Sequence, residues 1–344
     1  MKRTITNAVL ALFLAALIGA CSQNENGSES NPIDPTISTE RQTLPPPPPA
    51  NPAITYIDTK QYKYKGVTYN VPSVYVMDAD GSHKTMLWNN FTTNGNSGTY
   101  GTLTFPKWSG NGQKICFNMY YSGNNDVYTL DVTIVNGVPK ASNVTKIFTG
   151  NSSLWYGRPT WSPTANEIAL ISFPSANIQR VAVMPSTGGT PVTLYTCAST
   201  NYGIDSPCYS PDGTKIGFIM RNNTTQEHWI MVVERSTGNV LSSVSIGSSY
   251  RNCGIDWSRI SNSTTFALNG NPVSGSQTNL YTLDISVSTT PTQVMSNGTY
   301  PSWSPNDSQI AFHNPVGYGI SALTLSNSTT TSLSTTGAYP NWKR

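Results

Sequence analysis

Short apolar segments alternate with polar turns through most of the chain. In residues 167–170, 215–218 and 309–312 an Ile is followed by a small residue and then by a large apolar residue. Segments with alternating apolar and polar positions come after them, for example 126–131 and 279–284. Runs of this length, bounded by Pro, Asn, Asp and Gly, are typical of β-strands joined by tight turns. The pattern predicts an all-β fold for residues 54–344.

An aromatic residue recurs at the start of each of these units. In the best copies it opens a Trp-Ser-Pro turn, and the apolar strand follows that turn. The six aromatic anchors are Trp108, Trp161, Tyr209, Trp257, Trp303 and Trp342. Their separations run from 39 to 53 residues, a period typical of propeller blades, each of which is a four-stranded sheet. The sequence therefore predicts a six-bladed β-propeller.

The last anchor, Trp342, supplies only the first strand of a blade. Residues 54–57 match the apolar second strand, and residues 73–78 match the third. We therefore expect N- and C-terminal strands to close the last blade together, which would remove exposed sheet edges from the ring.

The repeat is similar to a known one. The residues around Trp161, Tyr209 and Trp303, with the strands that follow them, resemble the TolB-type, WD40-like propeller repeat. The resemblance covers residues 54–344. It implies a six-bladed propeller and a periplasmic protein partner, because TolB acts within an envelope complex. TolB has a further domain before its propeller, whereas this chain has a Pro-rich segment there, and a shared fold does not establish a shared function.

Residues 1–20 have the features of an export signal. Lys2 and Arg3 precede an apolar run, residues 8–18, which is short for a transmembrane helix. The run ends at Cys21 in a sequence that resembles a bacterial lipobox, so we expect acyl chains on Cys21, and two or three of them anchor a protein stably. Ser22 rather than Asp follows, which favours the outer membrane, facing the periplasm. An ordinary secretory signal is the alternative.

A polar, Pro-rich segment separates Cys21 from the first predicted strand. Residues 22–53 are rich in Ser, Asn, Glu and Pro and have few large apolar side chains, a composition typical of disorder. The Pro run at 45–49 predicts a stiff polyproline II spacer. The chain thus divides into a signal peptide (1–20), a lipidated Cys with a disordered tether (21–53) and a propeller (54–344).

The composition argues against several classes of function. Charged residues make up 11% of the chain, the net charge is +3, and no basic run occurs, so we expect no nucleic-acid partner. No Gly-x-Ser-x-Gly, His-Glu-x-x-His or phosphate-loop motif is present. We expect no catalytic residues, no metal and no cofactor, and structural roles for His83, His228 and His313.

Four cysteines follow Cys21. Cys116 lies in an apolar strand pattern, which predicts a buried thiol. Pairing among Cys197, Cys208 and Cys253 is possible in an oxidising compartment, but the spacing does not assign it.

A tyrosine occurs in the loop that enters the first strand of each predicted blade. Such loops converge on one rim of a propeller's channel, where tyrosine offers an apolar face and a polar tip for recognition. The candidate binding rim comprises Tyr100, Phe105, Tyr156, Arg158, Tyr202, Asp205, Tyr250, Arg251, Tyr300 and Tyr339. The alternative is that these tyrosines are packing residues of the repeat. Their offsets to the anchors vary from 3 to 8, so the six are not equivalent.

Three functions fit the sequence. The first is a monomeric, non-catalytic scaffold that is lipid-anchored in the envelope and binds an envelope protein or another ligand. The second is a carbohydrate-binding surface protein. The third is a propeller enzyme such as a polysaccharide lyase. We favour the first, because the sequence contains no catalytic set.

Overall fold

The computed structural model describes residues 51–94, 97–150, 155–164, 166–175, 178–197, 199–248, 250–271 and 277–344, without the side chains of 155–156, 175 and 251–253. The chain divides into the units Met1–Pro47 and Pro48–Arg344, and every described residue lies in the second. The predicted signal peptide, Cys21 and residues 22–50 of the predicted tether lie outside the described residues.

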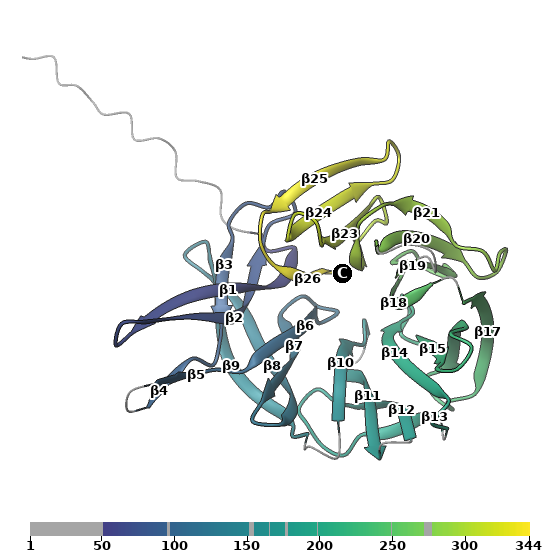
Figure 1. Ribbon diagram of the computed structural model, residues 1–344, viewed down its shortest axis with the longest axis horizontal. Helices are drawn as coiled ribbons and strands as arrows, with labels where there is room; N and C mark the ends of the chain where they lie inside the picture. Colours follow the sequence, from purple (N-terminus) through teal and green to yellow (C-terminus); the bar gives the residue numbers. More distant parts are fainter. Residues whose placement is uncertain are drawn as a thin grey trace, which may run out of the picture. The chain divides into compact units, whose positions relative to one another are not determined.

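The described residues form six four-stranded antiparallel sheets and one short hairpin, and they contain no helix (Figure 1). Blade one contains β6 (Thr102–Trp108), β7 (Lys114–Tyr121), β8 (Asn124–Val135) and β9 (Val138–Phe148). Blade two contains β10 (Trp155–Trp161), β11 (Glu167–Ser175), β12 (Ile178–Pro185) and β13 (Val192–Cys197). Blade three contains β14 (Tyr202–Tyr209), β15 (Lys215–Asn222), β16 (His228–Glu234) and β17 (Val240–Gly247).

The remaining three sheets complete the ring. Blade four contains β18 (Arg251–Trp257), β19 (Thr265–Asn271), β20 (Asn279–Asp284) and β21 (Thr292–Met295). Blade five contains β22 (Thr299–Trp303), β23 (Gln309–Asn314), β24 (Gly319–Thr324) and β25 (Thr329–Ser334). Blade six contains β26 (Ala338–Trp342), β1 (Ile54–Tyr64), β2 (Val67–Met77) and β3 (Thr85–Trp88), in that order. The predicted all-β, six-bladed propeller is confirmed.

Each blade presents one strand to the central axis: β6, β10, β14, β18, β22 or β26 (Figure 1). Each of these strands ends at an aromatic anchor, and all six anchors are at most 3% exposed. The hydrophobic clusters lie between neighbouring blades. One of them joins Ile230 of blade three to Trp257 and Phe266 of blade four. Because each blade buries one face against the next, the apolar strands are sequestered on both sides.

A β-bulge interrupts the innermost strand of five blades at the same place. Three residues before the anchor the backbone has a φ of +52° to +56°, and a proline follows. The five residues are Phe105, Arg158, Ser206, Tyr300 and Tyr339. The following proline has no N–H to give to the ladder, so two residues lie opposite one residue of the next strand. The bulge turns the side chain at this position toward the channel, where all five line one small cavity.

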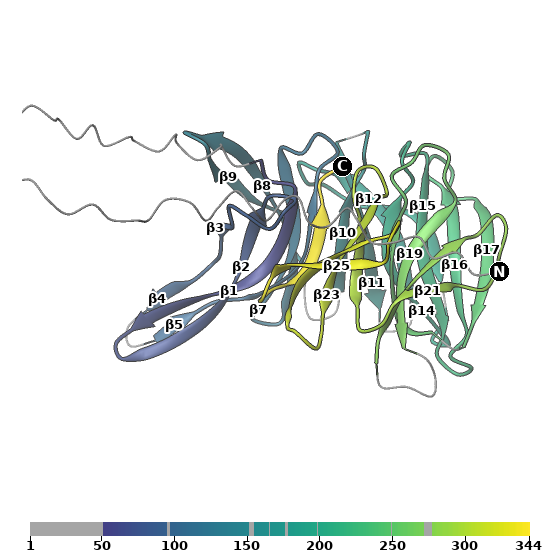
Figure 2. The same ribbon diagram turned by 90° about the horizontal axis from the view of Figure 1, so that it is seen from above.

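Two hairpins depart from the regular blade. The outer halves of β1 and β2, with the hairpin of β4 (Thr92–Asn94) and β5 (Ser97–Thr99), extend away from the ring (Figure 2). The ring of Phe91 stacks on Tyr62 at 4.6 Å and contacts Tyr69 at 5.4 Å, measured between centroids. This aromatic contact joins the short hairpin to the long one.

Cys116, Cys197 and Cys208 form no disulfide bond in the structure. Cys116 is a buried thiol, as the sequence predicted. Cys197 and Cys208 are free and buried, so the possible pairing between them is not found, and the side chain of Cys253 lies outside the description. Across the described part of the chain, no helix is long and apolar enough to cross a membrane.

Candidate binding site at the channel

Three aromatic rings close the channel near one face. Phe105 of β6, Tyr300 of β22 and Tyr339 of β26 all occupy the bulge position. Their ring centroids lie 4.6 Å apart for Phe105 and Tyr339, 4.5 Å for Tyr300 and Tyr339, and 5.9 Å for Phe105 and Tyr300. Tilted and edge-on contacts at these distances are favourable. We call this group the aromatic constriction.

Arg158 completes the constriction from the bulge of β10. Its guanidinium carbon lies 4.6 Å from the centroid of Phe105, in cation–π geometry. Its Nε pairs with Asp205 Oδ1 at 2.5 Å, and its Nη1 donates to Ser206 Oγ at 3.0 Å. Arg158 thus links blade one to blade three across blade two.

Buried asparagines of the preceding blades hold the backbone of two constriction residues, Arg158 and Tyr300. The side-chain oxygen of Asn118 accepts the N–H of Arg158 at 2.7 Å, and that of Asn269 accepts the N–H of Tyr300 at 3.1 Å. Both asparagines are at most 3% exposed. These contacts satisfy N–H groups that the bulge removes from the strand ladder.

A cavity of about 580 Å³, the face cavity, lies on one side of the constriction. Arg158 and Tyr300 belong to its wall, together with Phe173, Asp205, Arg221 and His228. Burial lowers the pKa of His228 to about 4, and its Nδ1 has no hydrogen-bond partner within the described part of the chain. His228 is therefore neutral at physiological pH. The wall combines apolar surface with two guanidinium groups.

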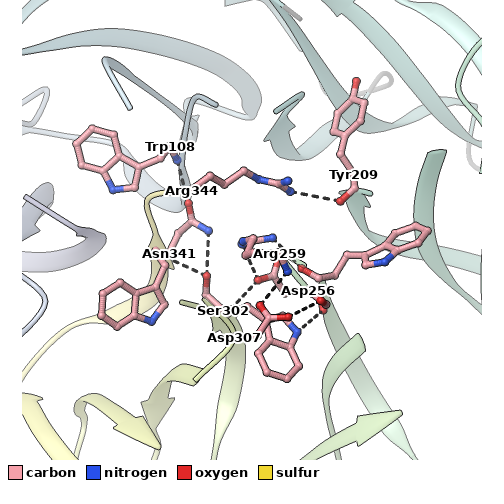
Figure 3. Close-up of polar contacts among 12 residues, drawn as sticks. Trp108, Tyr209, Asp256, Arg259, Ser302, Asp307, Asn341 and Arg344 are labelled. Carbon is pink, nitrogen blue, oxygen red and sulfur yellow. Dashed lines mark hydrogen bonds and ion pairs between the residues drawn. The ribbon is translucent and has the colours of Figure 1, made fainter. Parts of the chain in front are cut away.

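A second group of polar side chains, from several blades, lies close together near the inner strands (Figure 3). Arg344 reaches from the end of blade six to blade three, where its Nη2 donates to the carbonyl of Tyr209 at 3.3 Å. Arg259 Nη2 pairs with Asp256 Oδ2 at 2.8 Å, and both side chains are 5% exposed. Asp256 Oδ2 also accepts the N–H of Trp303 at 2.9 Å.

The structure separates the predicted rim residues into groups. Phe105, Arg158, Tyr300 and Tyr339 meet in the aromatic constriction, and Asp205 pairs with Arg158. Tyr202 packs on Trp229 at 6.1 Å, Tyr250 packs edge-on against Tyr281 at 4.9 Å, and Tyr100 is 36% exposed. The side chains of Tyr156 and Arg251 lie outside the description. The described tyrosines do not form one ring, and Tyr202 and Tyr250 pack within their own blades.

Several channel residues were missed by the sequence reasoning. They are Lys107, Arg221, Asp256, Arg259 and Arg344. A signal was present for some of them: Lys107 and Asp256 immediately precede an anchor, and Arg259 stands where three other blades have the proline of the Trp-Ser-Pro or Tyr-Ser-Pro turn. Among the described residues, no three His, Cys, Asp or Glu side chains form a group that could hold a metal ion.

Sequence comparison assigns no family. No family model matches the chain. An uncharacterized protein of Agrobacterium fabrum is 26% identical over 169 residues, which are 47% of this chain and 52% of that protein. The match therefore spans about half the length of this curated relative.

Comparison with solved structures gives broader agreement. TolB from Acinetobacter baumannii has a TM-score of 0.60 and 15% identity, over 84% of this chain and 66% of that protein. A putative TolB from Agrobacterium tumefaciens has a TM-score of 0.53 and 15% identity, over 83% and 88%. A chain of a nidogen–laminin complex has a TM-score of 0.57 and 8% identity, over 86% and 99%. Identities this low show a shared architecture, so the chain has a TolB-like six-bladed β-propeller fold.

Proposed function

We propose that this chain is a non-catalytic binding protein of the bacterial cell envelope, in which the propeller receives a segment of a partner protein in the face cavity. The TolB-like fold and the lipobox-like sequence before Cys21 support an envelope location. A lipid on Cys21 would hold the protein at the membrane, with residues 22–53 as the spacer. Mass spectrometry of the intact protein tests this anchor, because acylation adds a defined mass to Cys21.

The face cavity carries the proposal. Its volume of about 580 Å³ lies within the range of ligand sites in proteins. Phe173 and Tyr300 offer apolar contact, and Arg221 offers a cation on the cavity wall. Arg158 is already paired with Asp205. This chemistry suits an extended peptide segment that carries apolar side chains and a carboxylate.

A glycine in the wall of the face cavity, Gly203, allows a direct test of this proposal. A Cβ added at Gly203 would lie 3.6 Å from its nearest neighbour, Asn223 Oδ1, which is an ordinary contact distance. Gly203→Phe should therefore fill the cavity without straining the backbone. Gly317, in the exposed turn between β23 and β24, has similar space, with 3.5 Å to Asn314 Nδ2. Gly317→Phe is the matched control.

The measurement is a crosslinking pull-down from intact envelope with the tagged, lipidated protein. We expect wild type and Gly317→Phe to recover one and the same protein, and Gly203→Phe, shown to be folded, to lose it. Equal recovery by all three would remove the face cavity from the proposal. A polysaccharide-cleaving activity that is lost on chelation would contradict a non-catalytic role, and retention on a glycan without any protein partner would favour a carbohydrate-binding protein.

A further inference from the structure

A second, smaller cavity of about 40 Å³ lies on the channel axis, beyond the aromatic constriction from the face cavity. Arg158 and Tyr300 belong to the walls of both cavities, so the constriction separates them. We call the smaller one the axial cavity. Its wall includes two cations, Lys107 and Arg158, and no carboxylate.

Of the two cations in this wall, Lys107 is the one without a charged partner among the described residues. Arg158 is neutralised by Asp205, but the amine of Lys107 has neither an ion-pair nor a hydrogen-bond partner among the residues that the structure describes. Lys107 lies on β6 one residue before the anchor, facing into the ring. The burial of this amine lowers the pKa of Lys107. A buried ammonium group without a counter-charge is unfavourable, and such groups acquire a partner or lose their proton.

The neighbouring carboxylate, Asp256, forms no ion pair with Lys107. Asp256 Oδ2 pairs with Arg259 Nη2 and also accepts the N–H of Trp303. Arg344 adds a third cation on the axis, where it donates only to the carbonyl of Tyr209. Asp307 accepts the backbone N–H of Arg259 at 2.8 Å, so Arg259 contacts two carboxylates. Lys107 and Arg344, by contrast, form no ion pair with an Asp or Glu side chain among the described residues, and such cations attract an anion.

The wall supplies few other groups that could stabilise a negative charge. Prolines follow the bulge residue in five blades, and four of these prolines line the axial cavity without an N–H. The hydroxyl groups of Ser206, Tyr300 and Tyr339 are neutral donors in the wall. Burial and the neighbouring Tyr300 raise the pKa of Tyr339 to about 12, so its hydroxyl keeps its proton. An anion here would rely on Lys107 for charge and on hydroxyls for hydrogen bonds.

The volume limits the size of the ligand. At roughly 10–15 Å³ of such volume for one water molecule, 40 Å³ holds about three water molecules. A nucleotide or a sugar does not fit, whereas a chloride with a water molecule, or a formate, does. We propose that the axial cavity binds a small monovalent anion of this size at the amine of Lys107. This site is separate from the face cavity and does not depend on partner binding there.

The test uses carbon-13-labelled sodium formate as the probe, with the purified protein and with sodium gluconate, which is too large for the cavity, holding the ionic strength constant. We expect wild type to broaden the formate resonance saturably, and sodium chloride to reverse the broadening. Lys107→Met removes the charge and should lose the saturable broadening. Lys84→Met changes an exposed lysine that lines neither cavity and should behave as wild type.

A second measurement locates the anion without any substitution. A crystal soaked in sodium bromide should show an anomalous peak within hydrogen-bond distance of Lys107 Nζ. Bromide peaks at the protein surface alone would overturn the proposal, as would the absence of saturable broadening in wild type. Unchanged broadening by a folded Lys107→Met variant would overturn it as well. If Lys107→Met does not fold, Lys107→Gln takes its place, and the bromide experiment decides independently.

Discussion

At the scale of single residues, the bulge position combines backbone strain with bulky side chains. A positive φ disfavours any residue with a Cβ, and a following proline restricts that residue further. Even so, Phe105, Arg158, Tyr300 and Tyr339 occupy this conformation. Strain of this kind persists where the surrounding structure enforces it and is frequent at functional sites. The side chains are held in place by the fold, which gives the aromatic constriction a defined shape.

This strain predicts an unusual order of stabilities for two variants of Tyr300. Both Tyr300→Ala and Tyr300→Gly remove the ring contacts with Phe105 and Tyr339, but only glycine adopts a φ of +53° without a steric penalty. We expect the glycine variant to be more stable by about 1 kcal/mol. Urea unfolding followed by tryptophan fluorescence measures the difference. At neighbouring Thr299, whose φ is not positive, alanine should be the more stable of the two, and the same order at both sites would contradict the argument.

At the scale of strands and blades, neighbouring sheets are joined by polar contacts as well as by apolar clusters. Glu167 at the start of β11 accepts hydrogen bonds from Arg235, with Nε to Oε1 at 2.5 Å, and from the hydroxyl of Tyr209 at 2.8 Å. These partners belong to blade three or to the turn after β16. The hydroxyl of the anchor Tyr209 therefore contacts blade two directly, as the Nε1 of Trp303 contacts the carbonyl of Asp256 in blade four. The contact fixes the position of blade two against blade three.

The ion pair predicts a pH dependence of stability. Burial opposes ionisation of Glu167, but Arg235 and Tyr209 outweigh it and hold its pKa below the ordinary value. The stabilisation is therefore complete above the unfolded-state pKa of about 4.3 and is lost as the pH falls through the lowered folded-state pKa. Glu167→Gln should lower the free energy of unfolding at pH 7 by about 1–2 kcal/mol, since both side chains are partly exposed. Urea unfolding at pH 7 and at pH 3 measures both effects.

A second carboxylate provides the control for this prediction. Asp131 pairs with Lys114 in a more exposed position, with side-chain exposures of 25% and 42%. Asp131→Asn should cost about 0.5 kcal/mol or less at pH 7. Equal losses of unfolding free energy for Glu167→Gln and Asp131→Asn would contradict the prediction, because the contact between the blades would then stabilise the fold no more than the exposed ion pair does.

The regular blades could be predicted from the sequence, whereas their departures from regularity could not. Trp161, Trp303 and the turns that follow them are local signals that recur at intervals of 39 to 53 residues. The long β1–β2 hairpin and the short β4–β5 hairpin have no repeat counterpart, and Phe91 joins them through contacts between separate strands. Periodicity carries no information about such contacts.

The candidate site could be predicted in part, for a related reason. Tyr300 and Tyr339 precede their anchors by three residues, as Phe105 and Arg158 do, and the structure brings these four together. The other tyrosines were grouped with them by residue type at variable offsets. A fixed offset to the anchor decides which side chain faces the channel, since it sets the position in the bulge. Arg344 could not have been assigned this way, because its side chain crosses to the opposite blade.

At the scale of the whole molecule, the two ends of the propeller segment meet in blade six. Ile54 of β1 lies opposite Trp342 of β26, and the side-chain oxygen of Asn341 accepts the N–H of Trp108 in blade one at 2.9 Å. Asn341 also donates to Ser302 Oγ of blade five at 3.1 Å. One buried amide side chain therefore joins blades five, six and one.

Asn341 should accordingly be sensitive to substitution. Asn341→Ala leaves the buried N–H of Trp108 and the hydroxyl of Ser302 without this partner, which should cost about 1–3 kcal/mol. Thermal unfolding of the variant measures the loss. Asn327→Ala is the control, because Asn327 is exposed and accepts only from Thr329 in its own turn. A loss at Asn341 no larger than that at Asn327 would mean that this contact does not hold the ring closed.

The order of strands in blade six also determines when the propeller can close during synthesis. Synthesis runs from the N-terminus, so β1, β2 and β3 exist long before β26 does. Until β26 arrives, the inner edge of β1 presents unpaired N–H and C=O groups, the feature that makes a strand prone to wrong partners. Closure of the ring is therefore the last event, and it brings together the most distant strands at the highest entropic cost. The chain is therefore most exposed to wrong strand pairing between the synthesis of β1 and the synthesis of β26.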